Sequence, residues 1–415
     1  MACVVPPYTH AIYPPPLPAT RNLHRYLMQY SGFNCKFAFE HIMKSRYNMQ
    51  NLSGNILHSD VLQLFMMLVR CGIGKATELP FTPDEQQWNQ LYDFACKQAL
   101  QGIAFAGVEK LPQHQRPSSA LILNWYRAVV AIRANNKELT KNAILVSTKF
   151  ADEGFANAIL KGQGVAQYYP DPSLRVAGDI DIWLQGGCDK ILLYVRKYIP
   201  NAHPTYHHVD FPIRKGLDIE IHYRPTWMYN PIHNARLQRY FVERECTEFK
   251  HSLSTAAGEL HVPTVSFNLV FIPIHIYRHL FDEGIGMRQI LDYYFVLQHS
   301  TVDERLECVR LFKRIGMLRF MRALMYVMQQ MFGLDAEHMP VSPAAKDGNF
   351  LLNEIIESGN FGMYDARYQK SGRGYNMQHF KNQLKRSLML FRYYPSETLW
   401  NPPFKLWHTL WRMRH

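Results

Sequence analysis

Apolar and polar residues follow a helical rhythm over the first structured part of the chain. Apolar residues such as Leu62, Phe65 and Val69 recur three or four positions apart, which is the spacing of one helix face. The same pattern continues up to Glu153. It predicts four helices, over residues 61–72, 84–100, 119–134 and 137–153. We therefore expect the chain to begin with an all-helical region.

From residue 155 the rhythm shortens to runs in which apolar and polar residues alternate. Such runs predict strands over residues 155–160, 179–184, 207–213 and 217–223. Helices are expected between them, over residues 163–169 and 188–199. This order is typical of a small mixed sheet. Helical spacing then returns and predicts helices over residues 269–280, 288–298, 302–315 and 317–332. The fold class is therefore α+β and mostly helical.

These patterns divide the chain into four expected regions. They are an extension, a helical region, a mixed-sheet unit and a second helical domain, over residues 1–55, 56–135, 136–260 and 261–415. The extension has six prolines between residues 6 and 18, and we expect it to be disordered or poorly packed. Three later methionines, the last of them Met49, are alternative starts. Whether the extension belongs to the functional protein is left open.

Composition narrows the class of protein. The 415 residues are 47% apolar and 19% charged, which is enough to bury a large core over more than one domain. No apolar run has the roughly 18 residues that a membrane span needs. The net charge of +12 favours an anionic partner, such as a nucleotide, a nucleic acid or a membrane surface. Basic residues gather at residues 381–386 and 411–414, where a solvated face is expected.

The cysteines and the N-terminal sequence indicate the cellular compartment of the protein. The seven cysteines lie far apart and never form a C-x-x-C pair, which argues against a disulfide framework and a cysteine-based zinc site. They fit a reducing compartment, and no basic segment followed by an apolar run marks a secretory signal. We therefore expect a cytoplasmic protein.

Candidate chemistry begins with Asp179 and Asp181. Side chains two apart in a strand share a face, so these carboxylates project together while Ile180 and Ile182 point to the core. Two carboxylates so close repel each other unless a cation lies between them. Hard oxygen ligands of this kind suit Mg²⁺. The alternative is a strand end where both aspartates are simply solvated.

A second alternating strand strengthens the metal hypothesis. Asp218, Glu220 and His222 share one face of it, and if it pairs beside the first strand a third carboxylate joins the site. Three carboxylates around one or two metal ions are suited to reactions of a nucleoside triphosphate. His222 either orients Glu220 or forms a structural hydrogen bond, and the structural role is favoured.

In order and spacing, these residues resemble the uncharacterised bacterial nucleotidyltransferase family of the polymerase-β-like superfamily. The matching segments of the sheet unit are Leu160-Lys161-Gly162, Tyr168-Tyr169-Pro170, Arg175 to Asp181, and Glu220 to Arg224. Later segments also match: His275 to His279, Gly284 to Gln289, Asp292, Ser358 to Gly362, and Tyr394 to Glu397. The resemblance covers about residues 60–410 and implies a nucleotidyltransferase palm flanked by helical regions.

The resemblance also implies roles. Asp179 and Asp181 would be paired ligands of Mg²⁺ or Mn²⁺, with Glu220 as the third carboxylate and Asp218 as its substitute. The substrate would be a nucleoside triphosphate, and the group transferred is expected to be AMP. The acceptor is left open among a protein, an RNA, a sugar and a small molecule. The alternatives are a catalytically silent nucleotide-binding module, a phosphotransferase and a toxin-neutralising partner protein.

The phosphate-binding turn departs from the family pattern. Gly162 would let the backbone approach the phosphates, but Gln163 follows where a small residue is usual. Lys161 could supply charge instead, or could be a surface lysine at a strand end. Arg175 could reach a triphosphate or pair with a palm carboxylate, and the two are equally expected.

The roles of the polar helix residues are left open. His275 and His279 have a spacing that can bind zinc, but Ile276 stands where a metalloprotease needs glutamate. Arg288 and Asp292, also four apart, are expected to pair. These residues could bind the base, bind the acceptor or only lock helices together. The basic aromatic tail, with Trp400, Phe404, Trp407 and Trp411, is expected to pack on the helices rather than on a membrane or another protein. The sequence predicts no oligomeric state.

Overall fold

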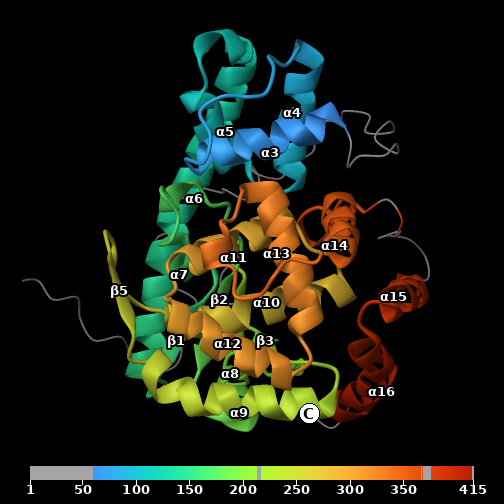
Figure 1. The fold of residues 1–415 in the computed structure, drawn as a ribbon. Coiled ribbons are helices and arrows are strands. Elements are labelled where there is room, and N and C mark those ends of the chain that lie inside the picture. Colours follow the sequence, from blue (N-terminus) through green and yellow to red (C-terminus); the bar gives the residue numbers. More distant parts are fainter. Residues whose placement is uncertain (1–58, 213–215, 366, 368–374, 414–415) are drawn as a thin grey trace, which may run out of the picture.

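The computed structural model describes the chain except for residues 1–58, 213–215, 366, 368–374 and 414–415. The extension expected over residues 1–55 therefore lies outside the described residues, as do Arg214 and Lys215 of the expected turn between two strands. The rest is mostly helical and holds two small sheets (Figure 1). The predicted α+β class is confirmed.

Three helices form the upper end of the molecule in Figure 1: α3 (Asp60–Gly72), α4 (Glu85–Lys97) and α5 (Gln101–Lys110). The side chains of Ser59 and Asp84 cap the first two, because each accepts a hydrogen bond from a free backbone N–H of the first turn. The sequence pattern did not predict α5. Most of this helix is buried, so no polar face marks its period.

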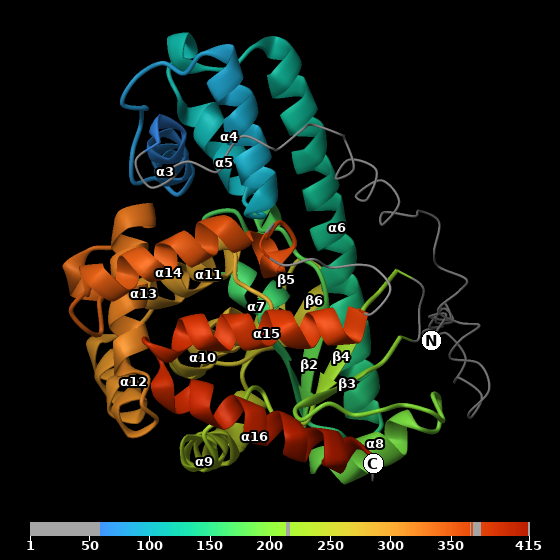
Figure 2. The ribbon, with the colours of Figure 1, turned by 90° about the vertical axis from the view of Figure 1, so that its right-hand side faces the viewer.

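One long helix, α6 (Ser119–Asp152), takes the place of the two shorter helices expected over residues 119–134 and 137–153. Polar residues at the midpoint are typical of a break between two helices, but here one of them forms hydrogen bonds inside the fold. The Asn136 side-chain amide donates to the carbonyl oxygens of Ser173 and Arg175, at 2.7 and 2.8 Å. Figure 2 shows α6 running from the upper helices down past the sheet. The boundary expected between residues 135 and 136 falls inside it.

The main sheet has four strands in the spatial order β1 (Asn157–Leu160), β2 (Ile180–Leu184), β4 (Ile219–His222), β3 (His208–Asp210). The central pair β2–β4 is parallel and places Asp181 opposite Glu220, while both outer pairs are antiparallel. The two predicted acidic strands therefore lie side by side. Helix α7 (Gly162–Ala166) follows β1, and α8 (Gly187–Val195) follows β2.

The two faces of this sheet have different neighbours. Ile180, Ile182 and Ile221 share a core with α6 and α8. The opposite face includes Trp183, which belongs to the core shared with the C-terminal helices. Since side chains alternate along a strand, Asp181 is on this second face. The acidic residues thus face the helical part of the molecule.

Two elements between the sheet and the C-terminal helices were not predicted. They are helix α9 (Pro231–Glu248) and a hairpin of β5 (Ser252–Thr255) and β6 (Gly258–His261). Asn230 caps α9 with its side chain and Pro231 occupies the first turn, an arrangement that favours a helix start.

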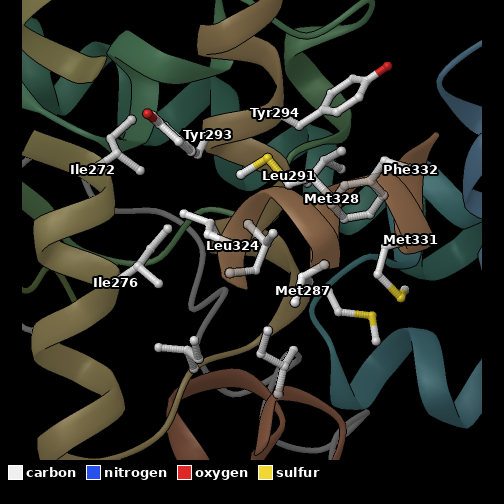
Figure 3. Packing of buried hydrophobic residues seen from close by; sticks show 14 of the residues in the cluster. Ile272, Ile276, Met287, Leu291, Tyr293, Tyr294, Leu324, Met328, Met331 and Phe332 are labelled. Atoms are coloured by element: carbon white, nitrogen blue, oxygen red, sulfur yellow. The ribbon is translucent and has the colours of Figure 1, made fainter. Parts of the chain in front are cut away.

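The C-terminal part begins with the four predicted helices α10 (Val265–Asp282), α11 (Met287–Gln298), α12 (Val302–Arg314) and α13 (Leu318–Phe332), and continues with α14 (Ala345–Ser358), α15 (Tyr375–Phe391) and α16 (Pro395–Arg412). Figure 3 shows how Leu291 of α11 and Leu324, Met328 and Phe332 of α13 fill the space between these helices. This core supports the helices that face the sheet.

The tail packs on the molecule as predicted, through Phe404. Its ring stacks on Trp227 with a centroid distance of 4.2 Å, while Trp400 and Trp407 remain partly exposed. The expectation of a solvated basic face over residues 381–386 is wrong for Arg386, which is buried and pairs with Asp365 at 3.2 Å. None of the described helices is both long and apolar enough to cross a bilayer.

Candidate active site

A cavity lies between the sheet and helices α10 and α11, and it collects most of the predicted site residues. Lys161, Gly162, Arg175, Asp179 and Asp181 all line it. The helical side contributes His275, Arg288 and Phe361, among others. Glu220, the remaining predicted site residue, is adjacent to Asp181 in the neighbouring strand and does not line this cavity.

Asp181 is the most constrained of these residues. Its side chain is only 2% exposed. One carboxylate oxygen lies 2.9 Å from Nζ of Lys161, and the other lies 2.9 Å from Nε2 of His222. Removing a carboxylate from water is costly unless its oxygens are paired. Both oxygens of Asp181 are therefore already engaged by residues of the chain.

Lys161 reaches Asp181 because of an unusual turn at the end of β1. Its backbone has φ 51° and ψ −136°, and Gly162 after it also has a positive φ, 38°. Residues other than glycine rarely adopt such a conformation, and it is often found at functional sites. Burial opposes the charge of Lys161, but Asp181, Asp179 and Glu220 together raise the pKa of its ammonium group. Lys161 therefore lies in the cavity wall beside Asp181 and is not a surface lysine.

Glu220 and His222 form a charged pair beside Asp181. Nε2 of His222 lies 3.3 Å from Oε2 of Glu220. Burial disfavours charge on both, but their hydrogen bond lowers the pKa of Glu220 to about 2. Burial also opposes charge on His222, but the hydrogen bonds that it donates to Asp181 and Glu220 raise its pKa to about 9. His222 thus contacts both carboxylates, which is more than the predicted structural hydrogen bond.

These residues also form a group with metal-binding geometry. The ligand atoms of Asp181, Glu220 and His222 lie within 4.8 Å of one another. The sequence predicted Asp179 as the partner of Asp181 in a metal site. In the structure Asp179 is half-buried and lines the cavity, whereas His222 completes the tighter group.

Arg175 pairs with a carboxylate, but not with one of the acidic strands as predicted, and its expected contact with a triphosphate stays a prediction. Its Nε and Nη2 donate to the two oxygens of Asp292 on α11, at 2.7 and 2.8 Å, and the Tyr169 hydroxyl donates to the same carboxylate at 2.7 Å. The carboxylate belongs to a helix and not to the sheet unit, because the loop before β2 packs directly on α11. Arg175 therefore joins the sheet unit to the helical domain.

The expected pair of Arg288 and Asp292 is also replaced. Since Asp292 binds Arg175, Arg288 instead donates from Nη1 to the carbonyl oxygen of Val176 at 2.7 Å. Its guanidinium lies 5.3 Å from the ring centre of Phe361. Its Nε is buried and has no hydrogen-bond partner among the residues that the structure describes. A buried arginine with a free donor beside a cavity is suited to bind an anion.

The two histidines of α10 extend the polar network. Nε2 of His275 lies 3.2 Å from Nζ of Lys161 and 2.9 Å from Nε2 of His279. Burial, and then the nearby Lys161 charge, hold the pKa of His275 well below its usual value, so this imidazole is neutral. Helix α10 thereby contacts Lys161, the cation of the sheet unit that pairs with Asp181.

Residues 84–333, more than half of the chain, match the family model described as uncharacterised nucleotidyltransferase. A crystal structure of an antigenic nucleotidyltransferase-like protein from Paracoccidioides brasiliensis is similar at 11% identity, over 51% of this chain and 97% of that one, with a TM-score of 0.30. No curated protein matches the chain in sequence.

Proposed function

Because the chain belongs to the uncharacterised nucleotidyltransferase family, we propose that it is a metal-dependent nucleotidyltransferase with a polymerase-β-like palm. It would move a nucleoside monophosphate, with AMP as the first candidate, from a nucleoside triphosphate to an acceptor hydroxyl. The observation that carries the proposal is the parallel register that sets Asp181 opposite Glu220, beside the cavity lined by Asp179 and Lys161.

The residues present fit a hard divalent cation. Asp181 and Glu220 offer carboxylate oxygens that lie within 4.8 Å of each other, and Asp179 offers another from the cavity wall. Oxygen donors of this kind suit Mg²⁺ or Mn²⁺. Such an ion supplies charge neutralisation of the phosphates and activation of the attacking hydroxyl.

The cations of the chain would bind the triphosphate itself. Lys161 and Arg288 both line the cavity, and the free Nε of Arg288 is available as a donor. Lys161 now neutralises Asp181 at 2.9 Å. On substrate binding its ammonium would exchange this carboxylate for a phosphate oxygen, which frees Asp181 as a metal ligand. Lys161 therefore keeps a negative partner in both states.

Substrate entry requires side chains to move. The free volume of the cavity is about 20 Å³, little more than the space that one water occupies. Phe361 stands against both Arg288 and His279 at this cavity. A triphosphate would thus displace Phe361 from Arg288.

The test uses the purified full chain with each of four nucleoside triphosphates labelled at the α-phosphate, in Mg²⁺ or Mn²⁺. The chain itself, total protein, total RNA and a sugar mixture serve as acceptors. We expect one triphosphate to label one fraction, and the added mass to identify the base. Asp179→Asn should lower the rate about 100-fold or more, because a charged group acting on the reacting phosphates is lost.

Asp189→Asn is the matched control. Asp189 is exposed in the first turn of α8, away from the cavity lining, so full activity is expected. Unchanged labelling by Asp179→Asn, or no labelling with any triphosphate, would exclude the proposal.

A second candidate is a nucleotide-binding protein without turnover. It is favoured by one observation, the pairing of both Asp181 oxygens with Lys161 and His222. Calorimetry distinguishes the two candidates. Binding of a triphosphate with Mg²⁺ and no labelled product would support this second candidate.

A further inference from the structure

Beyond Asp181, three imidazoles and one carboxylate gather at the outer edge of the sheet. His208 begins β3, and the antiparallel register sets it opposite His222 of β4. His207 precedes it in the chain, and Glu220 lies two positions before His222 on the same face. The roles proposed above for nucleotidyl transfer make no use of His207 or His208.

Three distances within this group are close to those between neighbouring ligands of one small metal ion. Nε2 of His207 lies 3.0 Å from Nδ1 of His208, which lies 3.4 Å from Oε2 of Glu220. The same Glu220 oxygen lies 3.3 Å from Nε2 of His222. Around tetrahedral zinc, with bonds of about 2.0–2.1 Å, neighbouring ligand atoms are about 3.3 Å apart.

The far side of each outer imidazole is held by another polar group. Nδ1 of His207 lies 3.4 Å from the hydroxyl of Thr205. Nε2 of His208 lies 3.5 Å from a carboxylate oxygen of Asp210. Metal-binding histidines are usually oriented in this way, because a partner on the outer nitrogen directs the other nitrogen toward the ion.

The three imidazoles also lie close enough to share one ion. The ligand atoms of His207, His208 and His222 lie within 4.8 Å of one another. Zinc binding would release the proton that His222 now donates to Asp181 and Glu220, because a metal-binding nitrogen must be unprotonated.

We propose that His207, His208, Glu220 and His222 bind one Zn²⁺ ion. Three imidazole nitrogens and one carboxylate oxygen form a set that zinc prefers and Mg²⁺ does not. This site differs in chemistry from the proposed oxygen-ligand site, and Glu220 would be a ligand shared by the two ions. Zinc on Nε2 of His222 would also release that nitrogen from Asp181, which it now contacts at 2.9 Å.

Metal content tests the proposal independently of any transfer activity. The full chain is stripped with a chelator, reloaded with Zn²⁺ and measured by elemental mass spectrometry and by competition with a zinc-binding dye. We expect His207→Ala and His208→Ala each to lose one zinc per chain, with affinity reduced about 100-fold or more. Asp210→Asn, which removes only an outer partner, should reduce affinity by about 10–100-fold.

Two histidine variants serve as matched controls. His203 is exposed and four positions before His207, so His203→Ala should keep the ion. His338→Ala tests the other group, Asp335, Glu337 and His338, which is mostly exposed. Loss of zinc only in that variant, or equal zinc in all variants, would overturn the proposal.

Spectroscopy covers the case in which a variant fails to fold. Co²⁺ loaded into the unaltered chain should give the intense visible bands of tetrahedral coordination, and the weak bands of octahedral Co²⁺ would contradict the four-ligand site. Asp179→Asn should keep its zinc. Retained zinc without label transfer in the unaltered chain would therefore disprove the proposed function alone.

Discussion

At the scale of single residues, the chemistry of the site depends on how Asp181 shares its two oxygens. Lys161 holds one and His222 the other, both at 2.9 Å. Any ligand that uses Asp181 must compete with a residue of the chain itself. The measured affinity for a metal ion or triphosphate is then the difference between two well-paired states, and not the full strength of the new contacts.

Two substitutions of Lys161 distinguish the effect of its charge from the effect of its backbone strain. Lys161→Ala and Lys161→Gly both remove the cation from a buried carboxylate, which costs about 3–5 kcal/mol. Only alanine keeps the strain of φ 51° at this position. We therefore expect the glycine variant to be the more stable by about 1 kcal/mol.

Urea denaturation of the two variants measures this difference. Equal stabilities, or a more stable alanine variant, would show that the turn relaxes when the ammonium is absent. Both variants should also lose triphosphate affinity if Lys161 binds phosphate as proposed.

Strand periodicity explains why part of the site could be predicted. A period of two fixes the shared face of Glu220 and His222, and pairing with β2 then brings them to Asp181. The partner of Arg175 could not be predicted, because Asp292 is 117 residues away and only the packing of α11 brings it near. The adjacent pair His207-His208 carried a signal that was missed, since it precedes a strand bearing alternate Glu and His.

At the scale of elements, the turn between α10 and α11 interlocks with the segment after α14. The backbone of Gly362 approaches so closely that a Cβ there would lie 1.9 Å from the carbonyl oxygen of Glu283. A Cβ on Gly286 would lie 2.8 Å from Cα of Asn360. These contacts fix the segment that carries Phe361 into the cavity.

Gly362→Ala is expected to destabilise the protein by about 2–4 kcal/mol, because it adds a clash to the cost of a positive φ. Its φ is 60°. Gly154→Ala is the matched control, since its φ is 80° and nothing lies within 4 Å of the added Cβ. That variant should lose only about 1 kcal/mol. Thermal unfolding measures both, and equal losses would contradict the interlock.

The differences from prediction at α5 and α6 have separate physical causes. Helix α5 is buried on nearly every side, so its sequence lacks the amphipathic stripe that marks a surface helix. The division of α6 followed two asparagines, which disfavour helices unless a tertiary partner uses the amide. The carbonyl groups of Ser173 and Arg175 supply that partner for Asn136.

At the scale of the whole molecule, a buried ion pair joins the sheet unit to the helical domain. Arg175 and Asp292 have only 6% exposed side chains each, and they form two hydrogen bonds across the interface. Breaking such a pair costs more than its formation contributes, because one charge is left without a partner. The cavity therefore has walls from two units that are fastened together.

A double-mutant cycle tests this link. Arg175→Ala and Asp292→Ala should each cost about 3–5 kcal/mol, while the double variant should cost clearly less than their sum. The exposed pair of Arg133 and Asp171, at 3.0 Å, is the control. Arg133→Ala should cost at most about 1 kcal/mol. Urea denaturation measures all four, and additive losses at Arg175 and Asp292 would contradict a coupled interface.

The length of α6 means that one rigid helix connects the upper helices to the sheet unit. At 34 residues and about 1.5 Å per residue, it extends for about 50 Å. Its upper part packs on α5. Near its midpoint, Asn136 forms hydrogen bonds with the loop that carries Arg175, and the Arg175 side chain binds α11. A binding partner that tilts the upper helices would therefore move that loop, because α6 connects the two. A tilt of the upper helices would in this way reach Arg175, a residue that lines the cavity.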